Sequence, residues 1–194
     1  MHKARLEAFS DGVLAIIITI MALDLHIPRG QQLGALQPLL PVFLCYVLSF
    51  VYIGIYWNNH HHMLHAAKRV SGGVLWANLH LLFWLSLFPF VTGWMGENSF
   101  GAVPTAIYGV VLMMAGAAYW ILARTLIAVE GKHSILAQAI GADRKGLLSV
   151  ALYALAIPLA FVHRLLAQAI FVAVALMWLV PDRRIERVLP PVTE

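Results

Sequence analysis

Charged residues are few in this sequence, and long stretches of it contain none. Residues 30–67, 70–96 and 98–123 each lack Asp, Glu, Lys and Arg. Across the 194 residues, 11% are charged and 61% are hydrophobic, whereas a soluble domain carries about a quarter charged residues because its surface faces water. The pattern therefore predicts an all-α membrane protein that crosses the bilayer several times.

A transmembrane helix needs roughly 20 mostly apolar residues, and six stretches of the sequence meet or nearly meet this length. We predict a single six-helix transmembrane domain over residues 1–194, with helices at approximately 7–27, 38–65, 72–95, 103–128, 146–162 and 164–181. Residues that end helices separate several of these stretches, such as Pro28-Arg29-Gly30 after the first. His163 and Arg164 would form a very tight turn between the last two spans.

The distribution of Lys and Arg among the predicted connections indicates the topology. One side of the membrane would hold Lys3, Arg5, Lys68, Arg69, Lys132, Arg144, Lys145, Arg183, Arg184 and Arg187. The other side would hold Arg29 and Arg164. Because basic loops remain in the cytoplasm, both termini are predicted to be cytoplasmic, with an even number of spans. The same loops account for the net charge of +4, so we expect no nucleic-acid partner.

The first predicted helix carries two carboxylates at a short spacing. The twelve residues between Asp11 and Asp24 are apolar or small except for Thr19. At about 1.5 Å per residue, this core is too short to cross a bilayer of about 30 Å. At least one carboxylate therefore lies near the membrane edge or inside it, where a charge is kept only when it is paired or meets water.

An apolar stripe also runs along this helix. With a step of about 100° per residue, the stripe consists of Phe9, Gly12, Ile16, Ile20 and Leu23. Thr19 lies at its flank, and Asp11 projects about 140° away from it. A pore lining would need such a stripe, but contact with lipid or with another helix produces the same pattern. The spacing alone leaves these three interpretations open.

The beginning of this helix resembles a known signature. Arg5-Leu-Glu-Ala-Phe9-Ser10-Asp11 and the apolar run after it are similar to the Arg-x-x-x-Phe-Ser-Asp motif of the transmembrane protein 175 family. Two later segments also resemble the family pattern: the first runs from Ser49-Phe50 through Trp57-Asn-Asn-His60-His61, and the second is Leu87-Phe-Pro-Phe-x-Thr92. Eukaryotic members are endolysosomal potassium channels with two six-helix repeats. The single repeat found here resembles the prokaryotic members, which assemble as tetramers.

This resemblance implies a homotetrameric, K⁺-selective cation channel in the plasma membrane, whose first helices line a central pore. Matched through the motif, the hydrophobic constriction falls on Ile16, Ile20 and Leu23, and the polar position beside it falls on Thr19. The expected partners are other copies of the chain, K⁺ and other monovalent cations, and membrane lipid. No cofactor and no enzymatic activity are expected. The sequence contains no Thr-Val-Gly-Tyr-Gly segment, so selectivity would not use that ladder of carbonyl groups.

A second set of residues is expected to hold the cytoplasmic ends of the helices together and to influence gating. By resemblance this motif network comprises Arg5, Phe9, Ser10 and Asp11, with Trp57 and His61 opposite them. Arg5 and Asp11 are six residues apart, which is poor geometry for an ion pair within one helix. We also consider the hypothesis that His60 or His61 contacts Asp11, so that protonation of a histidine tunes gating.

The histidines of the second helix support an alternative class of function. His60, His61, His62 and His65 lie together at one helix end, and His61 with His65 has the i, i+4 spacing of a metal-binding pair. A membrane-embedded metal-dependent enzyme or a transporter could use such a cluster. A catalytic metal would need a third ligand and an open position, and few acidic residues lie nearby in sequence. We therefore predict neither catalytic residues nor a metal site.

Overall fold

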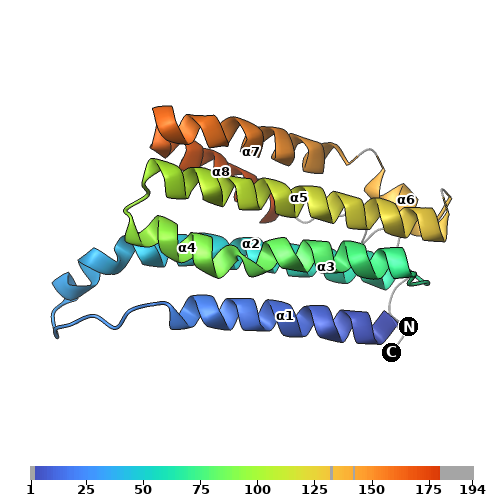
Figure 1. Cartoon of the computed structure of the whole chain (residues 1–194), viewed down its shortest axis with the longest axis horizontal. Coiled ribbons are helices and arrows are strands. Elements are labelled where there is room, and N and C mark those ends of the chain that lie inside the picture. Colours follow the sequence, from blue (N-terminus) through green and yellow to red (C-terminus); the bar gives the residue numbers. More distant parts are fainter. Residues whose placement is uncertain (1–2, 132, 142, 180–194) are drawn as a thin grey trace.

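The chain is a bundle of long helices in a computed structural model that describes residues 3–131, 133–141 and 143–179 (Figure 1). Within these residues all regular structure is helical. The helices are α1 (Lys3–Leu23), the 3₁₀ helix η1 (Leu33–Leu39), α2 (Leu40–Ala66), α3 (Gly72–Ser86), α4 (Phe88–Glu97), α5 (Ala102–Glu130), α6 (Ile135–Ile140), α7 (Arg144–Val162) and α8 (Arg164–Leu179). The prediction of an all-α protein is confirmed.

The helices are arranged in sequence from one side of the bundle to the other. α1 packs against α2, α3 and α4 at one side, while α7 and α8 pack against each other at the opposite side. α5 lies between these groups and contacts α3 and α4 as well as α7 and α8. As Figure 1 shows, α1 is therefore covered by the bundle on one face only.

Five of the six predicted spans have the length and composition of membrane helices in the described residues. They are Lys3–Leu23, Leu33–Ala66, Gly72–Glu97, Ala102–Glu130 and Arg144–Val162. The sixth, Arg164–Leu179, is apolar but shorter. Its predicted last two residues, 180 and 181, and the predicted basic residues Lys132, Arg183, Arg184 and Arg187 lie outside the described residues.

The bounds of α1 differ from the predicted 7–27. The helix begins at Lys3, and Lys3 Nζ lies 3.8 Å from Glu7 Oε1, an i, i+4 ion pair that an apolar window does not detect. It ends at Leu23, where the Leu25 N–H bonds to the Ala22 carbonyl in a tighter final turn, and Pro28 disfavours a helical conformation at the predicted last residue, 27. The helix is therefore shifted by about one turn toward the N-terminus.

The predicted third helix, 72–95, is two helices in the structure. α3 ends at Ser86 and α4 begins at Phe88, with Pro89 in the first turn of α4. Proline has no backbone N–H and cannot continue the hydrogen-bond ladder of a preceding helix, but it fits the first turn of a new one. The two helices nevertheless follow each other across the bundle as one span.

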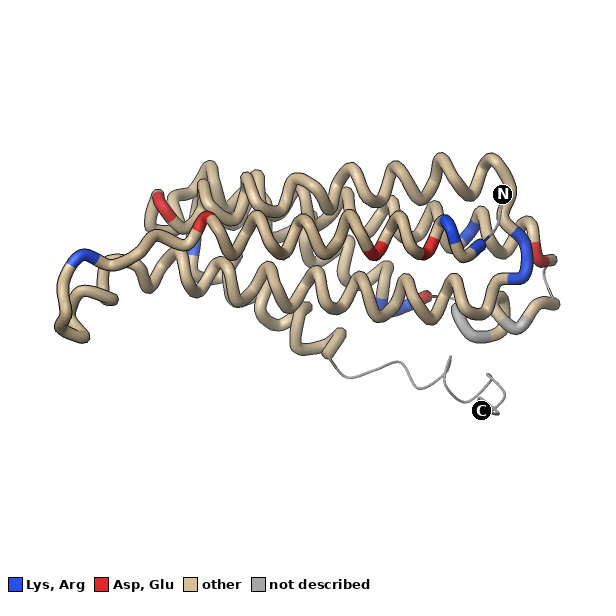
Figure 2. Tube along the Cα trace, turned by 90° about the horizontal axis from the view of Figure 1, so that it is seen from below, with Lys and Arg blue, Asp and Glu red and all other residues tan. Residues whose placement is uncertain are grey.

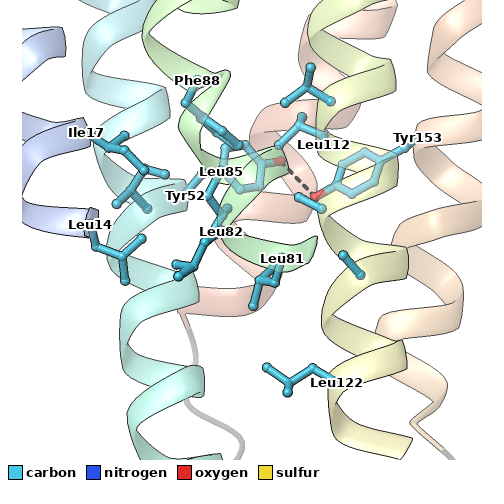
Figure 3. Packing of buried hydrophobic residues seen from close by; sticks show 14 of the residues in the cluster. Leu14, Ile17, Tyr52, Leu81, Leu82, Leu85, Phe88, Leu112, Leu122 and Tyr153 are labelled. Carbon is cyan, nitrogen blue, oxygen red and sulfur yellow. Dashed lines mark hydrogen bonds between the residues drawn. The ribbon is translucent and has the colours of Figure 1, made fainter. Parts of the chain in front are cut away.

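The interior of the bundle is packed with large apolar and aromatic side chains (Figure 3). Tyr52, Phe88, Tyr108 and Leu112 are fully buried. The Tyr153 hydroxyl donates to the Tyr52 hydroxyl at 3.2 Å, and the Tyr52 hydroxyl donates to the Phe171 carbonyl at 2.6 Å. Because the hydroxyls of Tyr52 and Tyr153 both have partners, the core holds these two polar groups without a large desolvation penalty.

Charged residues lie mainly at the two ends of the bundle (Figure 2). Lys and Arg gather at the end near the N-terminus, which also carries the connections after α2 and α5. The opposite end holds the connection that contains Arg29 and the start of α8 at Arg164. An apolar middle with charged ends is the distribution that a bilayer requires.

Candidate functional site

The predicted stripe on α1 is exposed in the single subunit. Phe9, Ile16, Ile20 and Leu23 have exposed fractions of 52%, 61%, 43% and 78%, respectively. The opposite face of the helix, formed by Leu6, Ser10, Leu14, Ile17 and Met21, is buried against the bundle. Four large apolar side chains in a row are thus largely uncovered by the described residues of the subunit. Lipid, another subunit or a pore must account for them.

The hydroxyl of Thr19 lies on the same exposed side. Its Oγ1 donates to the Ala15 carbonyl of the preceding turn at 2.8 Å. This bond satisfies the only hydrogen of the hydroxyl and leaves its oxygen lone pairs facing outward. Thr19 can therefore present an acceptor, and no donor, to whatever meets the stripe.

A buried chain of hydrogen bonds fixes the N-terminal half of α1. The Ser10 hydroxyl donates to the Leu6 carbonyl at 2.8 Å and accepts from the Asn78 amide nitrogen at 3.0 Å. The amide oxygen of Asn78 lies 2.7 Å from Nε2 of His60, so His60 donates through that nitrogen. All three side chains are buried. These hydrogen bonds therefore link α1, α3 and α2 by directional contacts.

Asp11 is held next to this chain by a tryptophan. The indole Nε1 of Trp57 donates to Asp11 Oδ1 at 3.0 Å, in a half-exposed position. His61 does not bond to Asp11, but its ring stacks on the Trp57 ring with centroids 6.0 Å apart. The carboxylate near the membrane edge is thus paired with an indole rather than with a cation.

The remaining predicted motif residues are exposed. Arg5 makes no hydrogen bond or ion pair with any described residue, and it lies on the same side of α1 as Phe9. Lys3, at the same helix end, donates to the His65 carbonyl at 3.1 Å. The structure brings Ser10, Asp11 and Trp57 into one cluster with His61 beside it, but it leaves Arg5 and Phe9 facing away from the subunit.

The histidine cluster divides between the interior and the surface. His60 is buried in the chain with Asn78, while the rings of His61 and His65 stack at 6.1 Å between centroids. Among the described residues, no group of three or more His, Cys, Asp and Glu is arranged to hold a metal ion. His60 and the other histidines therefore differ in surroundings although they are adjacent in sequence.

The C-terminal half of α1 meets a second polar cluster, in which Ser49 and Thr92 belong to segments that resemble the family pattern and Tyr108 does not. Tyr108 OH lies 2.9 Å from Ser49 Oγ, which lies 2.6 Å from Thr92 Oγ1, and Thr92 donates to Met21 Sδ at 3.9 Å. These hydroxyls belong to α5, α2 and α4. Tyr108 and Asn78 were not recognised from the sequence. A lone amide in an apolar membrane helix is costly unless it is paired, and that rule could have identified it.

The structure defines a multi-pass membrane protein, because several helices have membrane-spanning length. Its first helix presents an apolar stripe away from the subunit and contacts polar clusters on its other face. The comparisons with known proteins identify the group. The model of the family described as endosomal/lysosomal potassium channel TMEM175 matches residues 5–89. A protein named potassium channel from Chryseobacterium sp. (strain P1-3) is 52% identical over 189 residues, which cover 97% of this chain and 98% of the relative.

More distant relatives agree. The human protein named endosomal/lysosomal proton channel TMEM175 is 36% identical over 96 residues, which cover 43% of this chain and 19% of the human protein. The crystal structure of a lysosomal potassium-selective channel TMEM175 homolog from Chamaesiphon minutus matches with a TM-score of 0.81 and 25% identity, covering 93% of this chain and 97% of that one. The chain belongs to the TMEM175 family.

Membership in this family confirms the resemblance found in the sequence. The relatives are named as channels, so the chain is placed among channels and not among enzymes. They give no support to the alternative of a metal-dependent enzyme or transporter built on the histidines.

Proposed function

We propose that four copies of this chain form a K⁺-selective channel, with α1 of each copy lining a central pore. The observation that carries the proposal is the exposed stripe on α1, since Ile16, Ile20 and Leu23 face away from the subunit on a helix that packs on one side only. The relatives are named potassium channels, and we take K⁺ as the permeant ion for that reason. No cofactor is required, because conduction needs only a path for the ion.

Three rings of apolar side chains, one each from Ile16, Ile20 and Leu23, form the constriction in this proposal. An apolar ring conducts ions only when it is wide enough to hold water, and a narrower ring closes the pore by dewetting. K⁺ is more weakly hydrated than Na⁺ and sheds its water more easily. The oxygen of Thr19, with its hydrogen already donated to Ala15, lies between these rings and can accept the partly dehydrated cation.

The channel lies in the plasma membrane with both termini in the cytoplasm in this proposal. The support is the gathering of Lys and Arg at the end of the bundle that carries the N-terminus. Lys3, Arg5, Lys68 and Arg69 all belong to that end. The cluster of Ser10, Asp11, Trp57 and His61 then forms the cytoplasmic anchor of α1, and Arg5 and Phe9 face the neighbouring subunits.

A flux experiment in liposomes tests the pore assignment. Purified wild type should pass K⁺ better than Na⁺, and Ile16→Asn should raise the flux or reduce the selectivity, because a polar ring holds water more readily than an apolar one. Ile121→Asn is the matched control, since Ile121 is an exposed isoleucine on α5, away from α1. It should conduct like the wild type. Equal effects of the two substitutions would overturn the pore assignment.

Proton flux should be measured in the same vesicles with a trapped pH indicator, because the vertebrate relatives are named proton channels. Flux of K⁺ that exceeds that of Na⁺ supports the proposal whether or not protons also pass. A wild type that passes protons and no K⁺ would overturn it. Cross-linking or mass measurement of the detergent-solubilised protein tests the tetramer separately, and a monomer that conducts would exclude a shared pore.

A further inference from the structure

A groove of about 430 Å³ lies on the side of the bundle away from α1. Helices α2, α5 and α7 line it, together with Trp178 of α8, and none of its described lining residues belongs to α1. Small side chains create the space, notably Gly116 and Ala117 on α5 and Ala151 and Ala154 on α7. The groove is thus separate from the proposed pore.

The groove opens onto the outer surface of the membrane-spanning helices. Ala151 and Ala154 line it and are themselves exposed, and the neighbouring Leu147 and Leu155 on α7 are also exposed, at 58% and 52%. With α1 lining the proposed pore, the opposite side of the bundle, which carries these leucines, faces hydrocarbon, so this inference rests on the proposed function. Water gains few hydrogen bonds in an apolar groove. The occupant that fits this chemistry is therefore a hydrocarbon chain.

Two basic side chains are held at one end of the groove. The guanidinium carbon of Arg124 lies 5.4 Å from the centroid of the Trp120 ring, and Lys145 Nζ lies 4.8 Å from the centroid of the Trp178 ring. Both tryptophans line the groove. Tryptophan is enriched at the membrane interface, and a cation over its ring is attracted by the ring electrons. We therefore expect this end of the groove to lie at the level of the lipid headgroups. The rim therefore carries positive charge next to an apolar interior.

The acidic residue at this end is already engaged. Asp143 lines the groove, and its Oδ1 accepts from the Gly146 backbone N–H at 3.2 Å, which caps the start of α7. Arg144 is exposed beside it. Among the described residues that line the groove or contact its tryptophans, Arg124 and Lys145 are basic and Asp143 is acidic. The net charge of the rim is complementary to an anion.

We propose that the groove binds one anionic phospholipid, with an acyl chain between α5 and α7 and its phosphate between Arg124 and Lys145. Anionic headgroups attract basic side chains near the membrane surface, and the bonds of phosphate to Arg and Lys are charge-assisted. The apolar groove supplies affinity for the chain, and the two cations select the headgroup. Binding of lipid to this groove does not require the protein to conduct ions, so it can be measured separately from ion flux.

Brominated lipids test the site, because bromine on an acyl chain quenches tryptophan fluorescence on contact. The full chain is reconstituted in phosphatidylcholine vesicles that contain a small fraction of either dibrominated phosphatidylglycerol or dibrominated phosphatidylcholine. The anionic lipid should quench Trp120 and Trp178 at a concentration lower by about tenfold, given the contribution of each basic side chain near the surface. Trp178→Phe and Trp120→Phe each remove one of the six tryptophans, and each should remove part of this quenching.

Two variants locate the binding. Arg124→Gln with Lys145→Gln should abolish the preference for the anionic lipid, and Ala151→Leu with Ala154→Leu should fill the groove and abolish it as well. Ala169→Leu, at an exposed alanine of α8 that does not line the groove, should retain it. Equal quenching by both lipids would overturn the proposal, as would a preference that survives the filled groove. Quenching that is the same in the wild type and in both Trp→Phe variants would show that the lipid does not reach the groove, which also overturns it.

Discussion

The two halves of α1 are attached to the bundle by different kinds of contact. The N-terminal half is held by hydrogen bonds from two other helices, since Ser10 accepts from Asn78 and Asp11 accepts from Trp57. The C-terminal half is held mainly by the packing of Ile17 and Met21. Hydrogen bonds fix distance and direction, whereas apolar packing tolerates small displacements at lower free energy. The proposed constriction therefore lies on the less restrained half.

This difference gives the proposed gate a physical basis. Ile16, Ile20 and Leu23 follow the anchored segment along the same helix. A small tilt of the C-terminal half would change the width of the apolar rings while the N-terminal half stays in place. Since dewetting depends steeply on width, such a tilt is sufficient to open or close the pore. Substitutions in the two halves should accordingly differ in their effects on stability and on conduction.

The largest effect on stability is expected from Asn78→Leu. The substitution leaves Nε2 of buried His60 and the Ser10 hydroxyl without their shared partner, and such unsatisfied groups should lower the free energy of unfolding by about 3 kcal/mol. Thermal unfolding in detergent measures it. Asn98→Leu is the control, because Asn98 is exposed, follows α4 and bonds only locally to the Trp94 carbonyl, and it should change the stability by less than about 0.5 kcal/mol. Equal stability of wild type and Asn78→Leu would show that the hydrogen bonds among Ser10, Asn78 and His60 do not anchor α1.

A smaller loss is expected from Trp57→Phe, which keeps a ring for stacking with His61 and removes the indole N–H from Asp11. The bond involves a charged acceptor but is half-exposed, so we expect a loss of about 1 kcal/mol and an altered open probability in single-channel recordings. Trp76→Phe, at a highly exposed tryptophan of α3, should change neither quantity. If Trp57→Phe gates like the wild type, Asp11 is not part of the gating machinery.

The sequence predicts the spans and the stripe better than it predicts the polar contacts, for a physical reason. Long apolar stretches are required by the bilayer, and the stripe of Ile16, Ile20 and Leu23 follows from helical periodicity within one element. Contacts between helices depend on how each helix is rotated. His60 and His61 differ by about 100° around α2, so the sequence left open which of them meets the motif region. The structure brings His60 to Asn78 and leaves His61 on the surface.

Of two further features, the break before α4 was recognisable in the sequence and the role of Tyr108 was not. Pro89 predicts the start of a helix in its first turn, but the continuous apolar run from 72 to 95 suggested one helix and concealed the break at Leu87. Tyr108 gives no sequence signal of this kind, since an aromatic residue on a membrane helix is common. Only the packing of α2, α4 and α5 reveals that its hydroxyl completes a chain with Ser49 and Thr92.

Thr92→Val tests the polar contact of the C-terminal half. The substitution keeps the shape of the side chain but removes the hydroxyl between Ser49 and Met21, so we expect a loss of stability of about 1 kcal/mol and a change in the K⁺ to Na⁺ flux ratio. Thr92→Ser should restore both. Thr125→Val is the control, because the Thr125 hydroxyl bonds to its own helix. A flux ratio unchanged in Thr92→Val would limit this cluster to a structural role.

The smallest effect is expected from Gly12→Ala, and a matched glycine makes it informative. Gly12 lies between the anchored segment of α1 and Ile16, and Gly54 lies within α2; an added Cβ would meet nothing within 4 Å in the subunit at either position. Each substitution should raise the free energy of unfolding by about 0.5–1 kcal/mol, because alanine loses less backbone entropy than glycine on forming a helix. Thermal unfolding measures this gain.

The two glycine variants should differ in conduction. If the C-terminal half of α1 moves relative to the anchored half, a stiffer helix at Gly12 should alter the open probability by a few-fold, while Gly54→Ala gates normally. Equal gating of both variants, with equal gains in stability, would show that α1 moves as one body or that the constriction is static. In that case the different contacts of the two halves would matter for the folding of the subunit and not for gating. A change in pore width at Ile16 would then require movement of the whole subunit.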